Sequence, residues 1–382
     1  MKVLHVISDH NIGGAGVLLC NLLTHLESDI KSIVALPRGS ELELRIRAMG
    51  IPVLPLEYPC DRFCDRSVRE ISALIRQNGV DLLHANAALC ARIAGRMKGI
   101  PVVYTRHCCY PPVGSERVPF LREVMKIFNR VLCNCAIATA DAAARDLLRL
   151  GIPRERIRVI INGSMPVRAV GEQEKNAFLE HFGLTKEDFI IGICARLEAC
   201  KGQDVFLRAA KEVLERLPNK QIRFLVVGAG SCERELCALA ESLGIADAVR
   251  FTGFVSDMAP VYRVLRVNVN CSRGTETSCL ALSEGMSAGV PCVVSDYGGN
   301  PAMIGKSGAG LLYPVGDASA LADALCRIIE DKEMEKAMRQ AAKTRFETHY
   351  TASRMAREVG KLYRELSLSL KRGAMPLQSQ SK

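Results

Sequence analysis

Residues 267–304 read VNVNCSRGTETSCLALSEGMSAGVPCVVSDYGGNPAMI and suggest a strand, a helix and a second strand, in that order. The runs VNVNC and PCVVS are short, apolar and rich in β-branched residues, which is typical of buried strands. Between them, Thr277 or Ser278 is placed to cap a helix that stops at Gly289. Two strands joined through a helix form a parallel βαβ unit, so this segment predicts an α/β fold.

Similar apolar runs alternate with longer amphipathic segments along the whole chain. In the first half the runs are KVLHVIS, KSIVAL, IPVLPL, DLLHA, PVVYT, CAIAT and IRVII. In the second half they are FIIGIC, IRFLVVG, VRFTGF, VNVNC, PCVVS and GLLY. Segments between them, such as GVLLCNLLTHL, VREISALIRQNG, DVFLRAAKEVLERL and ERELCALAESLG, have the pattern of helices. The alternation predicts two doubly wound, Rossmann-like α/β domains.

The boundary between the two domains is predicted at 163–175, where NGSMPVRAVGEQEK interrupts the alternation with Gly, Pro and polar residues. The N-terminal domain then covers 1–165 and the C-terminal domain 176–345. An amphipathic segment at about 351–370 predicts a last helix, and the polar residues 371–382 predict a disordered tail. Open α/β sheets bind ligands beyond the carboxyl ends of their strands, so we expect the site between two facing sheets.

Composition places the chain among soluble globular proteins, because 48% of its 382 residues are hydrophobic and 24% are charged. No apolar run reaches about 18 residues, so we expect no membrane-spanning helix. The start, MKVLHVISDHNIGGAG, favours a first strand over a signal peptide and hence a cytoplasmic protein. The 16 cysteines are scattered without a CxxC…CxxC pattern, so we interpret them as structural thiols and expect no metal site.

The net charge of +10 is concentrated in the first half of the chain. Residues 1–165 carry 22 Lys and Arg against 15 Asp and Glu, whereas the remaining residues carry 29 against 26. This basic surface suits an anionic partner such as a membrane surface or a lipid diphosphate. A nucleic-acid partner is not expected, because no basic helix with interleaved aromatic residues is found and Trp is absent.

Two carboxylates and two cations follow predicted strands of the second half. Glu276 comes just before the helix after VNVNC, and Glu284 lies inside that helix. Arg196 and Lys201 follow FIIGIC in a loop that opens another helix. Cations and the free N–H groups of 278–280 suit phosphates, while carboxylates accept hydrogen bonds from sugar hydroxyls. Each pair considered alone also fits a plainer interpretation, namely a capping carboxylate or solvated surface charges.

The paired elements R-x4-K and E-x7-E, with GG-x-P after the following strand, resemble the retaining glycosyltransferase family 4, which has the GT-B architecture. The resemblance covers nearly the whole chain, from Gly13 to the C-terminal helix. It implies that Arg196 and Lys201 bind the donor diphosphate. It also implies that Glu276 holds the hydroxyls of the transferred sugar and Glu284 the nucleotide ribose. The final helix would cross back to the N-terminal domain.

Other positions fit the same resemblance. Gly13 and Gly14 follow the first strand without forming a GxGxxG motif, and His107 occupies the family's T-x-H position near the reacting sugar. Loops VVGAGSCERE and VRFTGFVSD resemble those that hold the nucleotide base. Together with the first turn after Glu276, these loops imply donor contacts at Gly228, Gly230, Phe254, Val255, Thr277, Ser278, Cys279 and Leu280. A tight turn, a structural histidine and ordinary strand–turn–helix packing are the plainer alternatives.

The function implied is retaining transfer of a hexose-type sugar from a UDP- or GDP-linked donor to a hydroxyl acceptor, in cell-surface polysaccharide or glycolipid synthesis. Arg196 and Lys201 would take the place of a metal ion, because no DxD-like pair of carboxylates follows a strand. No cofactor is expected besides the sugar nucleotide. No carboxylate is a convincing covalent nucleophile, so same-face departure and attack is implied. Two alternatives stay open: a GT-B-type sugar-nucleotide epimerase or hydrolase, and a non-catalytic sugar-nucleotide-binding subunit.

The sequence departs from the family pattern at two places. Thr277-Ser278-Cys279 replaces the usual EGFG-like run after Glu276, and Ala302 stands where Glu commonly follows GG-x-P. Both departures leave the identity of the sugar open. Acceptor choice is assigned to N-terminal loops, notably 106–117.

The segment RVPFLREVMKIFNRVL predicts an amphipathic basic helix. Its apolar side is formed by Phe120, Val124, Ile127, Phe128 and Val131. Two interpretations are open: the helix packs its apolar side under the sheet, or it lies on a membrane interface. In the second case the acceptor can be lipid-linked and the protein peripheral on the inner face of the plasma membrane.

Overall fold

The computed structural model describes residues 1–108 and 118–371. It consists of two compact units. The first unit comprises Met1–Gly163 together with the C-terminal segment from Ala352, and the second comprises Ser164–Thr351. The tail predicted to be disordered lies outside the described residues, apart from Lys371, and so does most of the predicted acceptor loop, 109–117.

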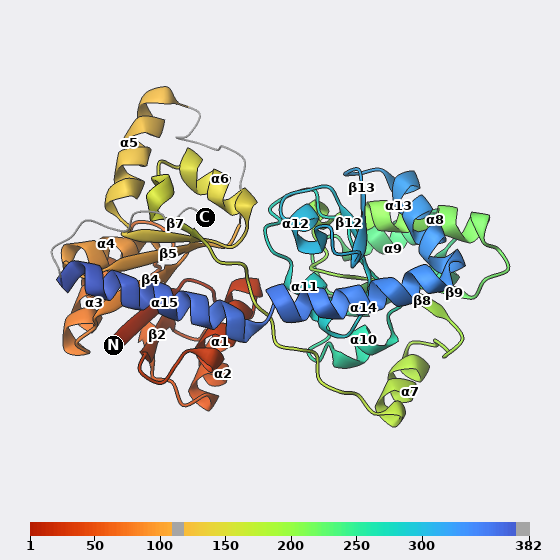
Figure 1. The fold of residues 1–382 in the computed structure, drawn as a ribbon, viewed down its shortest axis with the longest axis horizontal. Helices are drawn as coiled ribbons and strands as arrows, with labels where there is room; N and C mark the ends of the chain where they lie inside the picture. The colour runs from red at the N-terminus through yellow and green to blue at the C-terminus, as the bar shows by residue number, and fades with distance from the viewer. Residues whose placement is uncertain (109–117, 372–382) are drawn as a thin grey trace. The chain divides into compact units, whose positions relative to one another are not determined.

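The first unit is built on a seven-stranded parallel sheet with the order β3-β2-β1-β4-β5-β6-β7 (Figure 1). Its strands are β1 (Lys2–Ile7), β2 (Lys31–Pro37), β3 (Val53–Leu56), β4 (Leu82–Asn86), β5 (Val102–Arg106), β6 (Cys135–Ala138) and β7 (Ile157–Val159). The helices between them are α1 (Gly14–His25), α2 (Leu42–Ala48), α3 (Asp65–Gln77), α4 (Leu89–Met97), α5 (Pro119–Val131) and α6 (Asp141–Arg149). The strand order 3-2-1-4-5-6 is that of a doubly wound fold.

The last helix, α15 (Ala352–Lys371), belongs to this first unit and packs against α1. The Tyr363 hydroxyl lies 2.5 Å from Nδ1 of His84 on β4, and Arg364 forms ion pairs with Glu27 and Asp29. The prediction that the final helix crosses back to the N-terminal domain is therefore confirmed.

The second unit repeats the topology with six strands in the order β10-β9-β8-β11-β12-β13. They are β8 (Phe189–Cys194), β9 (Ile222–Val227), β10 (Val249–Gly253), β11 (Val267–Asn270), β12 (Cys292–Ser295) and β13 (Gly310–Tyr313). Its helices are α7 (Glu172–His181), α8 (Gln203–Arg216), α9 (Glu233–Ser242), α10 (Ala259–Val264), α11 (Leu280–Ser287), α12 (Asn300–Ile304), α13 (Ala318–Glu330) and α14 (Lys332–His349). Each predicted run contains one strand, and the predicted pair of Rossmann-like domains is confirmed.

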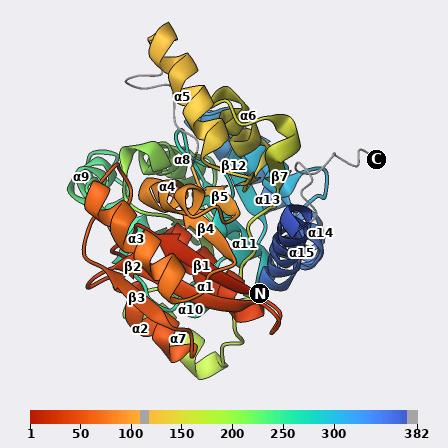
Figure 2. The same cartoon turned by 90° about the vertical axis from the view of Figure 1, so that its left-hand side faces the viewer.

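Helix α5 differs from the other helices of the first unit because its apolar side is exposed. It projects from the unit beside α6 (Figure 2). Only Asn129 is buried on this helix, whereas Phe120 and Ile127 are 75% and 63% exposed. The interpretation in which α5 packs its apolar side under the sheet is therefore wrong. Among the described residues, no helix combines the length and apolar character needed to cross a bilayer.

Candidate active site

The candidate site of the second unit lies where β8 and β11 end. These strands are parallel neighbours, with Val267 paired to Ile191, so the loops that follow them leave the same edge of the sheet. The first loop carries Lys201 and the second carries Glu276. Nζ of Lys201 lies 2.8 Å from Oε2 of Glu276, and the two side chains are only 17% and 8% exposed. The structure thus joins the two predicted elements in one buried ion pair.

A network of hydrogen bonds holds the Glu276 carboxylate in place. Ser272 Oγ donates to Oε2 of Glu276 over 2.8 Å, and the Ser272 amide donates to Oδ1 of Asn270. The same Oδ1 accepts from Nδ2 of Asn300 over 3.1 Å, and Ser295 Oγ donates to the Ser272 carbonyl. Both hydrogen bonds to the carboxylate reach Oε2. Among the described residues Oε1 accepts none, so this oxygen is available to a ligand hydroxyl.

Lys201 remains a cation in this environment. Burial is the largest single influence and lowers the pKa of Lys201, but opposing interactions led by the charge of Glu276 together raise it above its ordinary value. A buried ammonium held beside a carboxylate keeps donors for a further anionic oxygen. The pair therefore offers a cation and a carboxylate oxygen side by side.

Glu284 occupies the inner side of α11. The fully buried Tyr262 of α10 donates from its hydroxyl to Oε2 of Glu284 over 3.0 Å. Burial raises the pKa of Glu284, and this hydrogen bond offsets the rise only in part. The pKa of Cys194, the last residue of β8, is raised first by burial and then by the charge of Glu284. Glu284 therefore lies close to the strand end that precedes Arg196.

The start of α11 differs from the prediction. Cys279 is the N-cap residue and no side chain caps the helix, so the predicted cap at Thr277 or Ser278 is wrong. Thr277 is buried, and Ser278 Oγ instead contacts Met303 Sδ at 3.8 Å. The start of α11 consequently has no side-chain cap, an arrangement that suits an anionic ligand.

The reason for the displaced helix start lies in the GG-x-P turn. A Cβ atom at Gly299 would lie 1.5 Å from the Thr277 carbonyl oxygen, and one at Gly298 would lie 2.2 Å from that of Glu276. The turn therefore packs directly against the backbone of the two residues and holds them outside the helix.

Burial raises the pKa of Cys279 to about 12, so its thiol stays protonated.

Gly228 and Gly230 bring a third loop to the same edge. A Cβ atom at Gly228 would lie 2.1 Å from the Ala195 carbonyl oxygen, and one at Gly230 would lie 2.4 Å from that of Leu197. These contacts press the loop after β9 against the loop that carries Arg196. Of the predicted base contacts after β10, Phe254 is 75% exposed and Val255 is partly buried against the apolar core.

Arg196 stands apart from the other three ionic residues. Its residue is exposed, and its carbonyl oxygen accepts from Nε2 of Gln203 over 2.9 Å. Among the described residues, no hydrogen bond or ion pair involves its guanidinium group. The structure thus brings Lys201 and Glu276 into contact but leaves Arg196 facing solvent.

The predicted site residues of the first unit follow β1 and β5. Gly13 is the N-cap of α1, and Gly14 is its first residue. His107 follows β5, and its Nε2 lies 3.0 Å from Oδ1 of Asn86. Burial lowers the pKa of His107 to about 4, so the ring is neutral near pH 7.

Comparison with known proteins decides the family. Residues 12–164 match the family described as Glycosyltransferase Family 4, and residues 174–345 match the one described as Glycosyl transferases group 1. The chain belongs to the family 4 glycosyltransferases. A D-inositol 3-phosphate glycosyltransferase of Corynebacterium urealyticum is 29% identical over 320 residues, which cover 78% of this chain and 74% of the relative.

Two further proteins are similar to the chain. The UDP-Gal:alpha-D-GlcNAc-diphosphoundecaprenol alpha-1,3-galactosyltransferase of Escherichia coli is 24% identical over 305 residues, or 78% of each chain. The crystal structure of Anabaena HepE with UDP and glucose superposes with a TM-score of 0.81 at 20% identity. The superposition covers 95% of this chain and 99% of HepE, and it demonstrates the shared GT-B fold.

One departure of this glycosyltransferase from the family pattern has a clear structural setting. Ala302 lies within α12, and its carbonyl oxygen accepts from Nη2 of Arg345 over 2.8 Å and from the Tyr350 hydroxyl. These contacts fix the end of α12 through its backbone. They do not depend on the side chain at 302, so they are compatible with alanine.

Sequence reasoning missed several residues that support the site. Asn270 and Asn300 could have been found from the sequence. Asn270 is the last residue of a strand and Asn300 follows the two glycines of the GG-x-P turn, and both lie near the E-x7-E motif. Ser272 and Ser295 carried a weaker signal of the same kind. Tyr262 carried none, because its hydrogen bond joins two helices whose packing follows only from the fold.

Proposed function

We propose that this protein transfers a hexose from a UDP-linked donor to a hydroxyl acceptor, with retention of the anomeric configuration and without a metal ion. The observation that carries the proposal is the buried contact between Lys201 and Glu276 beside the uncapped start of α11. A cation, free amides and an accepting carboxylate oxygen match the diphosphate and the sugar hydroxyls of such a donor. HepE was crystallised with UDP and glucose, which supports the choice of uridine.

In this proposal each side chain has one role toward the donor. Lys201 and the first amides of α11 hold the diphosphate, and Oε1 of Glu276 accepts a hydrogen bond from a sugar hydroxyl. Glu284, oriented by Tyr262, accepts hydrogen bonds from the ribose. Arg196 is free to turn its guanidinium group toward the diphosphate, because no described residue binds it. Gly228 and Gly230 hold the loop after β9 at this edge, where the base would bind.

The transfer breaks the bond between the anomeric carbon and the diphosphate oxygen and forms a bond to the acceptor oxygen on the same face. The acceptor proton passes to the departing diphosphate. Lys201 stabilises the charge that builds on this leaving group, as preorganised donors do in other active sites. This role is the one a metal ion would otherwise fill. The neutral His107 is suited to accept or donate a hydrogen bond near the sugar, not to supply charge.

The proposal extends to the membrane. Helix α5 contacts its own unit through its polar edge, because Arg92 donates to Oδ1 of Asn129 and Nδ2 of Asn129 donates to the Leu150 carbonyl. Its apolar side therefore points to solvent, and the same helix carries the exposed Arg122 and Arg130. A helix with exposed Phe, Ile, Val and Leu beside cations suits an anionic membrane surface.

A membrane position would favour a lipid-linked acceptor in cell-surface glycan synthesis. The name of the E. coli relative specifies a diphosphoundecaprenol-linked acceptor, which supports this class. The basic excess of residues 1–165 suits both the anionic surface and a lipid diphosphate.

The deciding experiment measures release of UDP from UDP-hexoses in EDTA, with and without a polyprenyl-diphosphate-linked sugar. We expect release that depends on the acceptor and persists in EDTA, with an α-linked product from an α-linked donor. Turnover without any acceptor would favour the epimerase or hydrolase, and binding without turnover would favour the non-catalytic subunit.

A further inference from the structure

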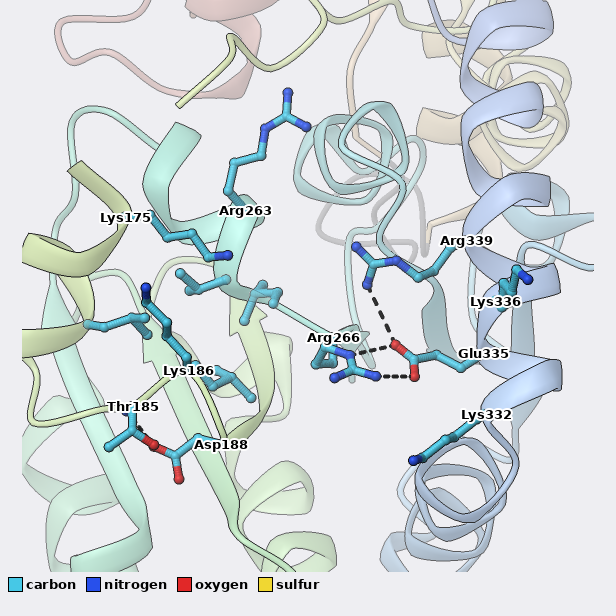
Figure 3. Close-up of a pocket in the computed structure, with 14 residues that line it drawn as sticks. Lys175, Thr185, Lys186, Asp188, Arg263, Arg266, Lys332, Glu335, Lys336 and Arg339 are labelled. Atoms are coloured by element: carbon cyan, nitrogen blue, oxygen red, sulfur yellow. Dashed lines mark hydrogen bonds and ion pairs between the residues drawn. The ribbon is translucent and has the colours of Figure 1, made fainter. Parts of the chain in front are cut away.

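A cavity lies at the opposite edge of the second sheet, away from the candidate active site. It has a volume of about 400 Å³ and is lined by residues of α7, α10 and α14 and by the starts of two strands (Figure 3). Ile190 is the second residue of β8, and Arg266 immediately precedes β11. The loops of Lys201 and Glu276 leave the other ends of these same strands. The cavity is therefore distinct from the site described above.

The lining of this cavity is strongly cationic. Seven Lys and Arg side chains line it against two carboxylates, those of Asp188 and Glu335. The cations are Lys175, Lys186, Arg263, Arg266, Lys332, Lys336 and Arg339. A concave surface with an excess of one charge concentrates ligands of the opposite charge.

The two carboxylates compensate only part of this excess. Asp188 accepts from the amide of Thr185 over 2.6 Å and from its hydroxyl over 3.1 Å. Glu335 accepts two hydrogen bonds from Arg266, one of them from Nε over 2.6 Å, and lies 3.6 Å from Arg339. One buried carboxylate thus serves two guanidinium groups, and the remaining cations have no acidic partner in the lining.

The lysines are the least compensated cations. Within the described part of the chain, Lys332 and Lys336 take part in no ion pair. Lys175 and Lys186 lie 3.9 Å and 4.0 Å from Glu172, whose side chain is 72% exposed. Exposed pairs at this distance contribute little binding energy, so both ammonium groups remain available to a ligand.

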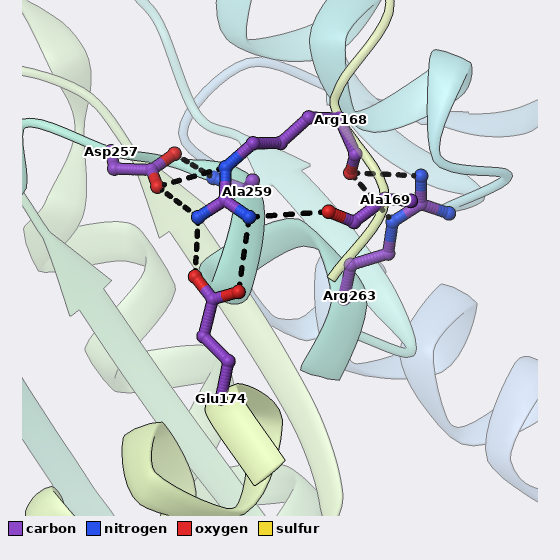
Figure 4. Close-up of polar contacts among 6 residues, drawn as sticks. All are labelled: Arg168, Ala169, Glu174, Asp257, Ala259 and Arg263. Atoms are coloured by element: carbon purple, nitrogen blue, oxygen red, sulfur yellow. Dashed lines mark hydrogen bonds and ion pairs between the residues drawn. The ribbon is translucent and has the colours of Figure 1, made fainter. Parts of the chain in front are cut away.

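The guanidinium group of Arg263, at the rim of the cavity, hydrogen-bonds to backbone carbonyl oxygens. Arg263 donates to the carbonyl oxygens of Val167 and Arg168, whereas Arg168 itself is paired with Glu174 and Asp257 (Figure 4). This arrangement fixes the segment before α7 and leaves the positive charge of Arg263 without an acidic partner. Arg263 therefore adds to the field of the cavity while holding its wall in place.

Burial is the main influence on the charged form of Arg339, and a neighbouring cation adds to it. Burial lowers the pKa of Arg339, Glu335 opposes this change, and the nearby Arg266 adds to it. An arginine stays protonated under all ordinary conditions, so Arg339 keeps a buried positive charge that a bound anion would stabilise.

We propose that this cavity binds a small ligand that carries two or more phosphate groups. Lys175 and Lys186 lie on one side of the cavity and Lys332 and Arg339 on the other, so the cations are arranged for more than one anionic group (Figure 3). Phosphates carry about two charges each and three accepting oxygens, and Arg and Lys are their usual partners. The volume falls in the range of small-molecule sites, roughly 300–1,000 Å³.

The apolar floor adds a requirement for the rest of the ligand. Leu179, Ile190, Val264 and Leu265 line the cavity between the cationic walls. A nucleoside or another compact organic group fits such a floor, while free polyphosphate would use only the walls. Pyrophosphate and ATP therefore serve as the two probes, the first for the charges and the second for charges and floor together.

The test is calorimetric titration of the full chain with pyrophosphate and with ATP. We expect both to bind, and the double substitution Lys186→Ser and Lys332→Ser to weaken binding about tenfold or more through loss of two charged contacts. The matched control is Lys220→Ser with Lys306→Ser, two exposed lysines of the same unit that lie outside the cavity. The control pair should change the affinity by less than about twofold, because salt screens the interaction between the ligand and distant exposed charges.

The Lys201→Ala variant keeps this cavity separate from the proposed active site, because UDP also carries two phosphates and could enter either site. In that variant UDP should bind more weakly while pyrophosphate and ATP still bind, and adding the Lys186 and Lys332 substitutions should remove the remaining binding. Failure of UDP to bind would count against the proposed function alone. Equal weakening of pyrophosphate in both lysine pairs, or no binding of either probe by the wild type, would overturn the cavity proposal.

Discussion

Nζ of Lys201 lies 2.8 Å from Oε2 of Glu276, although the two residues are 75 positions apart in the chain. The contact exists because β8 and β11 are adjacent parallel strands and each residue follows the carboxyl end of its strand. A buried ion pair is costly unless its members do further work or are fully hydrogen-bonded, and this one leaves Oε1 and part of the ammonium available. The pair is therefore the natural centre of the proposed donor site.

Lys201→Ala should lower kcat by about 10²–10³, because the substitution removes a preorganised donor to the leaving diphosphate. It also leaves the Glu276 carboxylate buried without its partner, so stability must be measured in parallel. The double variant Lys201→Ala with Glu276→Gln removes that charge and should recover the melting temperature but not the activity. Steady-state kinetics and thermal melts of both variants check this. Full activity in the single variant would exclude Lys201 from the reaction.

Glu284→Gln should weaken UDP binding by roughly 1.5–3 kcal/mol, because the ribose loses a charged acceptor. The variant should also remove a pH dependence. Burial raises the pKa of Glu284 above its ordinary 4.5, and the ionised form is the one that accepts from hydroxyls. UDP affinity of the wild type should therefore fall as the pH decreases toward that raised pKa. Calorimetry between pH 7.5 and 5 compares the two proteins, and parallel curves would contradict the assignment.

His5→Leu should make the first unit less sensitive to acid. Burial lowers the pKa of His5 to about 3, so between pH 6.5 and that value the unfolded chain binds a proton that the folded chain does not. The free energy of unfolding then falls with decreasing pH by up to about 1.4 kcal/mol per unit for each such histidine. His84 and His107 act in the same direction.

The measurement is urea denaturation between pH 7 and 5, followed by circular dichroism. The leucine variant should show a shallower decline of stability with falling pH than the wild type. His10→Gln, which changes an exposed histidine, is the control and should follow the wild type. An unchanged slope in His5→Leu would mean that the ring takes up its proton in the folded state.

Phe120→Ser combined with Ile127→Ser should abolish binding to anionic vesicles without affecting the fold. The two side chains are 75% and 63% exposed on α5, so their loss removes apolar contact with a bilayer and no contact with the protein core. Flotation with phosphatidylglycerol vesicles measures the effect. The control pair Leu44→Ser with Phe63→Ser changes two equally exposed apolar residues of the same unit and should still float. Wild-type protein that stays at the bottom of the gradient would remove the membrane proposal.

The strands were predictable because buried parallel strands leave a simple pattern: FIIGIC reads as a continuous apolar run since both faces of its sheet are covered. The start of α11 was not, because it depends on Gly299 packing against Thr277 from a different loop. The exposed side of α5 was also undetermined, since the same amphipathic pattern fits a packed helix. Only the placement of Asn129 against Arg92 and Leu150 decides which edge faces the protein.

The loop that carries each charged residue was anticipated better than the surroundings of its side chain. The spacing of Arg196 and Lys201 placed both in one loop, yet their side chains differ in surroundings, since one is exposed and the other pairs with Glu276. Rotamer choice after a strand end depends on neighbouring loops, which no local pattern describes. The Tyr262 contact to Glu284 is hidden from the sequence for the same reason.

The most direct test of the central claim is a crystal structure of the protein with an intact UDP-hexose in the presence of EDTA. The account predicts a diphosphate oxygen within about 3 Å of Nζ of Lys201 and of the first amides of α11, with a sugar hydroxyl on Oε1 of Glu276. A donor bound elsewhere, with the Lys201–Glu276 pair untouched, would contradict it.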